Sequence, residues 1–347
     1  MLGKRLKSFL GRNIVRLPNR LLVKMSGGEP VVVEGRTLDP SLQYLLSKMT
    51  AQPALQEMPL ADSREFIVTG ANTFAVKKAK LARVEDRLIE GRDGPIPVRI
   101  YFPEGVDVQK PGLVAYHGGG WVTGNLESYD RVARTYAATA NCILVSVDYR
   151  LAPESPFPAA LHDCYDAWSW TQAHAAELGM DAHRIGVAGD SAGGNLAAAV
   201  CVVARERGET MPVLQLLVYP ALDLRARTES YDTCGQEGFG LTRATMEWFI
   251  ENYVRGEEDL LNPLVSPLLD ADLGSMPTTI IATAGFDPLL DEAAHYAQRL
   301  EEAGVSVTYH CYDSLIHGYQ TMAGAIDTAG KALQETTDLL RRELHRG

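Results

Sequence analysis

After about residue 80, short apolar runs alternate with longer stretches of helical pattern. The segments 84–91 and 97–103 read as two strands of a hairpin joined at Arg92-Asp93-Gly94-Pro95. Further strands are predicted at 112–118, 142–149, 184–190, 213–220, 278–285 and 305–312, four of them almost continuously apolar, as in sheets covered on both faces. Helices are predicted between them at 129–140, 159–178, 192–206, 288–303 and 328–342. This order predicts an α/β fold with a mostly parallel sheet that begins with an antiparallel hairpin.

Two segments interrupt the alternation. Residues 1–60 contain helical patches broken by prolines and glycines, and residues 223–265 separate two strands by more chain than a simple crossover needs. We interpret both as parts of one helical cap, with 1–60 as an N-terminal cap region and 61–347 as the catalytic domain that carries the 223–265 insertion. One helical face of the insertion can be core or the wall of a substrate pocket: Met246, Phe249, Ile250 and Tyr253.

Composition narrows the function classes. The chain has 347 residues and 46% hydrophobic composition, enough for a large core, but no apolar run approaches the ~18 residues of an integral membrane span. The net charge of the chain is −11, even though no acidic residue precedes Glu29. This excess of negative charge argues against nucleic acid as a partner. Arg12 and Arg16 interrupt any secretory signal, and the five cysteines form no C-x-x-C pair. We therefore expect a cytoplasmic protein without structural metal.

The strongest chemical motif is Gly189-Asp190-Ser191-Ala192-Gly193, which fits G-x-S-x-G between a predicted strand and a predicted helix. A strand that turns sharply into a helix forces the serine toward a positive φ and leaves no room for side chains at the flanking glycines. A glycine-rich helix start alone can produce the pattern. The position between strand and helix nevertheless favours Ser191 as a nucleophile.

A serine hydroxyl of ordinary acidity is a weak nucleophile, so it needs a base and an acid that orients the base. In α/β-hydrolases these partners follow the serine as Asp or Glu and then His, on loops after later strands. Asp287 and His317 occupy such loops in this order. Asp287 can also cap the helix predicted to begin at Pro288, and His317 can be an ordinary loop histidine, but no other histidine lies in the required loop.

The segment His117-Gly118-Gly119-Gly120-Trp121 follows a predicted buried strand. It matches neither phosphate-binding pattern, G-x-x-x-x-G-K-[ST] or G-x-G-x-x-G at a helix start. With a serine nucleophile present, the backbone N–H groups of Gly119, Gly120 and Ala192 are expected to form an oxyanion hole. His117 is expected to fix this loop by hydrogen bonding, while Trp121 either lines a pocket or packs in the core.

Six segments together carry a resemblance to a known family: HGGGW, DYRLAPESPFPAALHD, GDSAGGNLA, YPALD, AGFDPLLDE and IHGY. From about residue 80 onward, the chain resembles the hormone-sensitive-lipase-like α/β-hydrolases, the bacterial family IV esterases. The resemblance implies an eight-stranded mostly parallel sheet, a cap built from the N-terminal region and the insertion after YPALD, and hydrolysis of short- or medium-chain esters. It implies no cofactor, and it leaves a homodimer open because dimers are common in that family.

The predicted function is a serine carboxylesterase, with Ser191 as nucleophile, His317 as base, Asp287 as orienting acid, and the amides of Gly119, Gly120 and Ala192 as oxyanion hole. The predicted partner is a small-molecule ester. Three alternatives remain at this stage. An amidase or peptidase uses the same triad; plant gibberellin receptors share the fold as small-molecule binders but lack the catalytic histidine; and a metal-dependent hydrolase would need a ligand cluster that the sequence lacks.

Overall fold

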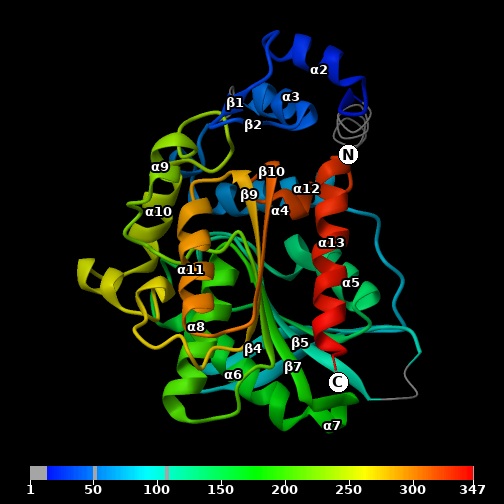
Figure 1. The fold of residues 1–347 in the computed structure, drawn as a ribbon. Helices are drawn as coiled ribbons and strands as arrows, with labels where there is room; N and C mark the ends of the chain where they lie inside the picture. The colour runs from blue at the N-terminus through cyan, green and yellow to red at the C-terminus, as the bar shows by residue number, and fades with distance from the viewer. Residues whose placement is uncertain (1–13, 50–52, 106–108, 347) are drawn as a thin grey trace.

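The computed structural model describes residues 14–49, 53–105 and 109–346. Its centre is an eight-stranded sheet with the strand order β10-β9-β8-β7-β5-β6-β4-β3 (Figure 1). The strands of this sheet are β3 (Arg83–Gly91), β4 (Gly94–Phe102), β5 (Lys110–Tyr116), β6 (Ile143–Val147), β7 (Met180–Asp190), β8 (Leu214–Val218), β9 (Thr278–Phe286) and β10 (Val307–Ile316). The predicted eight-stranded sheet is confirmed.

Strand direction follows the predicted pattern. Neighbours from β10 to β6 pair in parallel, whereas β4 pairs antiparallel with both β6 and β3. The central strand β5 lies between β7 and β6, where Val114 is opposite Val187 on one side and Val145 on the other. Every residue of β5 is buried, which explains why the strand has no charged residue after Lys110 and reads as a mostly apolar run.

Helices cover both faces of the sheet (Figure 1). On one face α6, α8 and α11 pack with Val114 and Tyr116 of β5, and on the other α5 and α13 pack with Leu113 and Ala115, because successive strand residues point to opposite faces. The helices are α5 (Leu126–Thr139), α6 (Ala159–Ala173), α7 (Ala175–Leu178), α8 (Ala192–Arg207), α9 (Glu229–Thr233), α10 (Arg243–Tyr253), α11 (Leu290–Glu302), α12 (Tyr319–Met322) and α13 (Asp327–Leu344). The helix predicted over 159–178 is therefore interrupted at His174, whose ring contacts the Trp170 carbonyl of the preceding turn.

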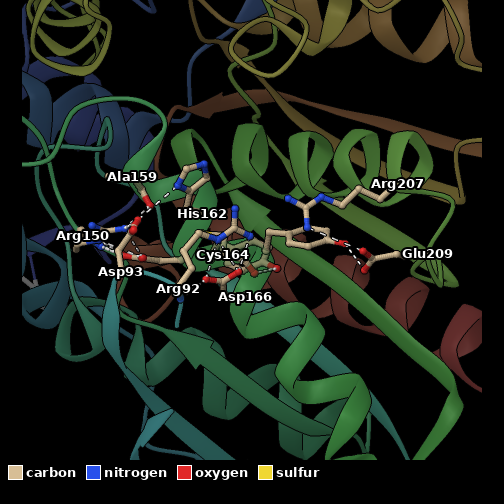
Figure 2. A network of polar contacts seen from close by, with 12 residues as sticks. Arg92, Asp93, Arg150, Ala159, His162, Cys164, Asp166, Arg207 and Glu209 are labelled. Carbon is tan, nitrogen blue, oxygen red and sulfur yellow. Dashed lines mark hydrogen bonds and ion pairs between the residues drawn. The ribbon is translucent and has the colours of Figure 1, made fainter. Parts of the chain in front are cut away.

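A polar network fastens the β3–β4 hairpin to α6 (Figure 2). The Arg92 side chain pairs with Asp166 at 2.6 Å, and Arg150 pairs with both Asp93 at 2.9 Å and the buried Asp163 at 2.8 Å. These hydrogen bonds to Asp163 raise the pKa of Arg150, so the guanidinium stays charged. The network holds the antiparallel edge of the sheet against the helical layer.

The N-terminal segment and the insertion after β8 lie at the carboxyl ends of the parallel strands (Figure 1). The N-terminal elements are α2 (Asn19–Met25), β1 (Val32–Val33), β2 (Arg36–Thr37), α3 (Pro40–Met49), the short 3₁₀ helix η1 (Leu55–Glu57) and α4 (Leu60–Phe74). The Asp39 amide donates to the Ser314 carbonyl at 2.9 Å, which joins the segment to the end of β10. The division into a cap region 1–60 and a catalytic domain 61–347 stays a prediction. No helix in the described ranges is long and apolar enough to cross a membrane.

Candidate active site

Ser191 lies at a sharp turn between β7 and α8. Its backbone has φ 53° and ψ −121°, the strained conformation predicted from the motif. A Cβ added to Gly189 would collide with the backbone of Gly193, and one added to Gly193 would collide with the Tyr116 carbonyl. The Ser191 amide donates to the Val218 carbonyl at 2.9 Å. Backbone packing against the neighbouring strands β5 and β8 therefore sustains the strain at Ser191.

Asp287 and His317 meet Ser191 at this edge of the sheet. His317 follows β10, and its Nε2 lies 2.9 Å from Ser191 Oγ while its Nδ1 lies 2.8 Å from Asp287 Oδ2. Asp287 follows β9, is fully buried, and uses its other oxygen to accept the Leu289 amide at 2.9 Å. The helix begins at Leu290 rather than Pro288, because residues 287–290 form a turn around this carboxylate. Asp287 thus bonds to the backbone at the helix start while it contacts His317.

The glycine loop after β5 packs against the turn that carries Ser191. Gly119 and Gly120 have φ values of +127° and +61°, which glycine adopts readily. The Gly119 carbonyl accepts the amide and the hydroxyl of Thr123, both at 2.9 Å, and this closes the loop. Within the described residues, the amides of Gly119, Gly120 and Ala192 have no hydrogen-bond acceptor. Three free donors near a serine hydroxyl are the components that an oxyanion hole requires.

Two buried polar side chains contact the backbone of this loop at Gly118. Burial lowers the pKa of His117, so the ring is neutral; its Nδ1–H donates to the Gly118 carbonyl at 2.8 Å, and the ring stacks on Tyr149. Burial raises the pKa of Asp190 to about 6, and its carboxylate lies against the Gly118 backbone. These contacts match the expected structural role of His117 in fixing the loop.

Aromatic residues lie beside the glycine loop and beside His317. Trp121 is fully buried and stacks on Tyr253 of α10, so it packs in the core rather than lining an open pocket. Phe249 of α10 lies directly over Gly120, where an added Cβ would collide with its ring. Tyr219 was not singled out from the sequence. The centroid of its ring lies 4.7 Å from that of the His317 ring, and its backbone has a φ of +35°. Its position at the end of β8, in the quoted YPALD segment, was the available signal.

Glu292 is a buried carboxyl group beside the site, and the sequence did not indicate it. It lies in the first turn of α11 and is fully buried. Its Oε1 accepts the amides of Leu222 at 2.6 Å and Asp223 at 3.3 Å, which ties the loop after β8 to the helix after Asp287. The pKa of Glu292 is raised well above its ordinary value, mainly by burial and in addition by the nearby negative charges of Asp223 and Asp287. Despite these acids, the described part of the chain contains no group of three or more His, Cys, Asp or Glu side chains arranged to hold a metal ion.

Replacing Glu292 by glutamine is expected to stabilise the protein in a pH-dependent way. Because the carboxyl pKa is higher in the folded than in the unfolded state, the folded state binds more protons above the unfolded pKa of about 4.3, and native stability falls as pH rises. Glutamine cannot ionise, so the variant avoids this loss. The melting temperature should exceed that of the native protein by about 2 °C or more at pH 8, with a smaller difference at pH 5.

The exposed Glu301 in the same helix provides the control. Differential scanning calorimetry between pH 5 and pH 8 should give a Glu301→Gln curve parallel to that of the native protein. A Glu292→Gln difference that does not change with pH would show that Glu292 has the same pKa in both states, contrary to the prediction.

Comparison with known proteins assigns this chain to a family. Residues 113–321 match the family described as the alpha/beta hydrolase fold, a range that includes Ser191, Asp287, His317 and the glycine loop. The chain belongs to this family. The membership confirms the resemblance predicted from the motifs.

Several relatives in the family are named ester hydrolases. The carboxylic ester hydrolase LipN of Mycobacterium tuberculosis is 39% identical over 93% of this chain and 87% of its own length. Carboxylesterase NlhH of the same species is 42% identical over 82% of this chain and 94% of its own length. Among solved structures, an ester hydrolase from the metagenome of Lake Arreo in complex with a derivative of bipyridine phosphonate gives a TM-score of 0.85 at 37% identity, covering 89% of this chain and all of that one. A hyperthermophilic esterase from Pyrobaculum calidifontis gives 0.80 at 38% identity, covering 88% and 98%.

Proposed function

We propose that this protein is a serine carboxylesterase that hydrolyses esters with short to medium acyl chains. The carrying observation is the hydrogen-bonded series from Ser191 Oγ through His317 to Asp287, beside three backbone amides without acceptors. The ester hydrolase class is supported by relatives of about 40% identity over most of the chain. The roles of the individual residues are our inference from this geometry.

Acylation begins when His317 Nε2 accepts the proton of Ser191 as its Oγ attacks the ester carbonyl carbon. The His317 ring becomes positively charged, and the buried Asp287 carboxylate, 2.8 Å from Nδ1, stabilises this charge and keeps the ring in the required tautomer. The amides of Gly119, Gly120 and Ala192 donate to the negative oxygen of the tetrahedral intermediate. Each such donor typically contributes ~3–4 kcal/mol to transition-state stabilisation.

Collapse of the intermediate releases the alcohol, which takes the proton from His317, and leaves an acyl group on Ser191. Water then enters, His317 removes its proton, and the resulting hydroxide attacks the acyl carbon. The second tetrahedral intermediate uses the same three amides, and its breakdown returns the proton from His317 to Ser191 and frees the acid. No step requires a cofactor.

The preference for short to medium acyl chains is supported by apolar side chains that crowd the site. Ser191 is only 8% exposed. Next to His317, the side chains of Ile316 and Leu46 approach Gly240, with distances of 3.6 and 3.9 Å to the position of its missing Cβ. Leu46 belongs to the N-terminal segment and Gly240 to the insertion after β8. Both predicted cap segments therefore meet at Ile316, the residue before His317.

Two of the three alternatives that the sequence left open keep the same fold and do not need a metal. An amidase or peptidase would use the same residues, and the names of the relatives favour esters over amides. A receptor role without catalysis is disfavoured by the contact between His317 and Ser191, since the receptors of this fold lack that histidine. A cytoplasmic setting is also proposed, because all five cysteines are free thiols and four of them are buried. Assembly as a homodimer stays a prediction.

Steady-state hydrolysis of p-nitrophenyl esters with acyl chains from acetate to laurate tests the proposal, with the matching p-nitroanilides as the comparison. We expect the highest kcat/KM at short to medium length and at least ~100-fold slower reaction of the anilides. A p-nitrophenyl alkylphosphonate should add one phosphonyl group to Ser191, detected by mass spectrometry of the digested protein. Faster turnover of the anilides would favour the amidase alternative, and neither turnover nor labelling would favour the receptor.

A further inference from the structure

The glycine loop adopts an unusual backbone over three consecutive residues. Gly119, Gly120 and Trp121 have φ values of +127°, +61° and +60°. A positive φ is common for glycine, but for a bulky side chain such as tryptophan it is a true exception that needs support from surrounding packing. The orientation of the Gly119 and Gly120 amides depends on this run of dihedral angles. Whatever holds Trp121 in place therefore also determines where those amides point.

Two aromatic residues of α10 contact this run. The Tyr253 ring stacks on the Trp121 ring with a centroid distance of 4.5 Å and an interplanar angle of 7°, and both side chains are fully buried. The Phe249 ring occupies the space beside Gly120 in which a Cβ would stand. Residues four apart lie on one face of a helix, so a single face of α10 contacts both the glycine and the tryptophan.

The helix α10 is itself anchored on both sides of the loop. The Tyr253 carbonyl accepts the Phe157 amide at 2.7 Å, and the Thr245 hydroxyl donates to Gln56 of the N-terminal segment at 3.0 Å. The Trp121 carbonyl, in turn, accepts the Ala152 amide at 2.9 Å. These bonds fix α10 relative to the 152–157 segment that also holds the loop. The two aromatic contacts are therefore built between anchored elements rather than made by a mobile helix end.

We propose that Tyr253 and Phe249 are positioning residues that hold the Gly119 and Gly120 amides in the orientation that binds the oxyanion. The inference rests on the proposed function, since it deepens the role assigned to those amides. The predicted cap insertion then does more than cover the substrate: through α10 it completes the oxyanion hole. Displacing α10 is expected to weaken transition-state binding while substrate binding changes little.

The structure offers a matched pair of variants at one position. The Tyr253 hydroxyl is buried and has no hydrogen-bond partner among the described residues, so Tyr253→Phe removes only an unsatisfied group and keeps the stack. Tyr253→Leu removes the ring that lies on Trp121. We expect Tyr253→Leu to lower kcat for p-nitrophenyl butyrate by at least ~10-fold with KM within about threefold of native, because loss of one full oxyanion donor costs ~100- to 1,000-fold. Tyr253→Phe should stay within twofold.

A trifluoromethyl ketone separates positioning from stability. Its adduct with a serine nucleophile carries an oxyanion, so its inhibition constant reports on the amides, whereas active-site titration with a phosphonate reports how much protein is folded. The inhibition constant of Tyr253→Leu should rise by about the same factor as kcat falls, with kcat counted per titrated site. Phe249→Leu, a smaller change in volume, should shift both quantities in the same direction if Tyr253→Leu does not fold.

Unchanged kcat per titrated site and unchanged ketone affinity in Tyr253→Leu and Phe249→Leu, with only a lower melting temperature, would overturn the positioning role and leave core packing. Native protein that neither turns over the ester nor binds the ketone would instead overturn the proposed function, and the positioning role with it. The two failures are distinguishable because the second is already visible in the native protein.

Discussion

Replacing Ser191 by alanine is expected to lower kcat for p-nitrophenyl butyrate by roughly 10⁵- to 10⁶-fold, the loss typical when the nucleophile of such a triad is removed. Alanine has no hydroxyl to attack the carbonyl, so the acyl-enzyme cannot form. The variant should still fold, because Ser191 makes its structural hydrogen bonds through its backbone, including the amide bond to the Val218 carbonyl at 2.9 Å. Stopped assays with concentrated enzyme measure the residual rate.

Two controls define the result. Ser275, which is exposed, should tolerate replacement by alanine with kcat within twofold of native. The KM of Ser191→Ala should stay close to the native value, since the amides and the cap remain. A residual rate above about one percent of native, with labelling by the phosphonate at another residue, would show that Ser191 is not the nucleophile.

Asp287→Asn is expected to lower kcat by about 10⁴-fold at neutral pH with little change in KM. Asp287 Oδ1 accepts the Leu289 amide and Oδ2 faces His317 Nδ1. In the variant, the asparagine oxygen remains on the Leu289 amide, so its NH₂ group faces Nδ1. That nitrogen must then be unprotonated to accept a hydrogen bond, which moves the ring proton to Nε2. The ring can no longer accept the Ser191 proton, although the packing is almost unchanged.

The other acids that follow strands in this region provide the comparison. Asp291→Asn and Asp313→Asn should each keep kcat within about fivefold of native, since Asp291 accepts the Ser230 amide and neither residue is hydrogen-bonded to His317. Steady-state kinetics and thermal unfolding of all three variants separate a lost base orientation from a lost fold. A larger effect at Asp291 or Asp313 than at Asp287 would assign the orienting acid elsewhere.

The local pattern of apolar and polar residues was sufficient to predict the parallel sheet, the hairpin and the order of the motif loops. A strand covered on both faces is apolar along most of its length, so β5 was recognisable from residues 112–116 alone. A parallel α/β sheet brings the carboxyl ends of its strands to one edge, so three loops distant in sequence could be expected to meet there. The helix ends were less well predicted: the break at His174 and the turn at 287–290 depend on single side-chain contacts with the backbone.

What the sequence determined by itself is therefore the fold class and the residues that reach the site, because strand periodicity, glycine turns and motif order are written in neighbouring positions. Only the tertiary structure decided which face of α10 meets the glycine loop, that Tyr219 borders His317, and that Glu292 joins two loops behind Asp287. These contacts join residues tens of positions apart, and an apolar or acidic side chain carries no local sign of its partner. Their energy depends on the distance and burial that folding creates, which is why a linear pattern does not contain them.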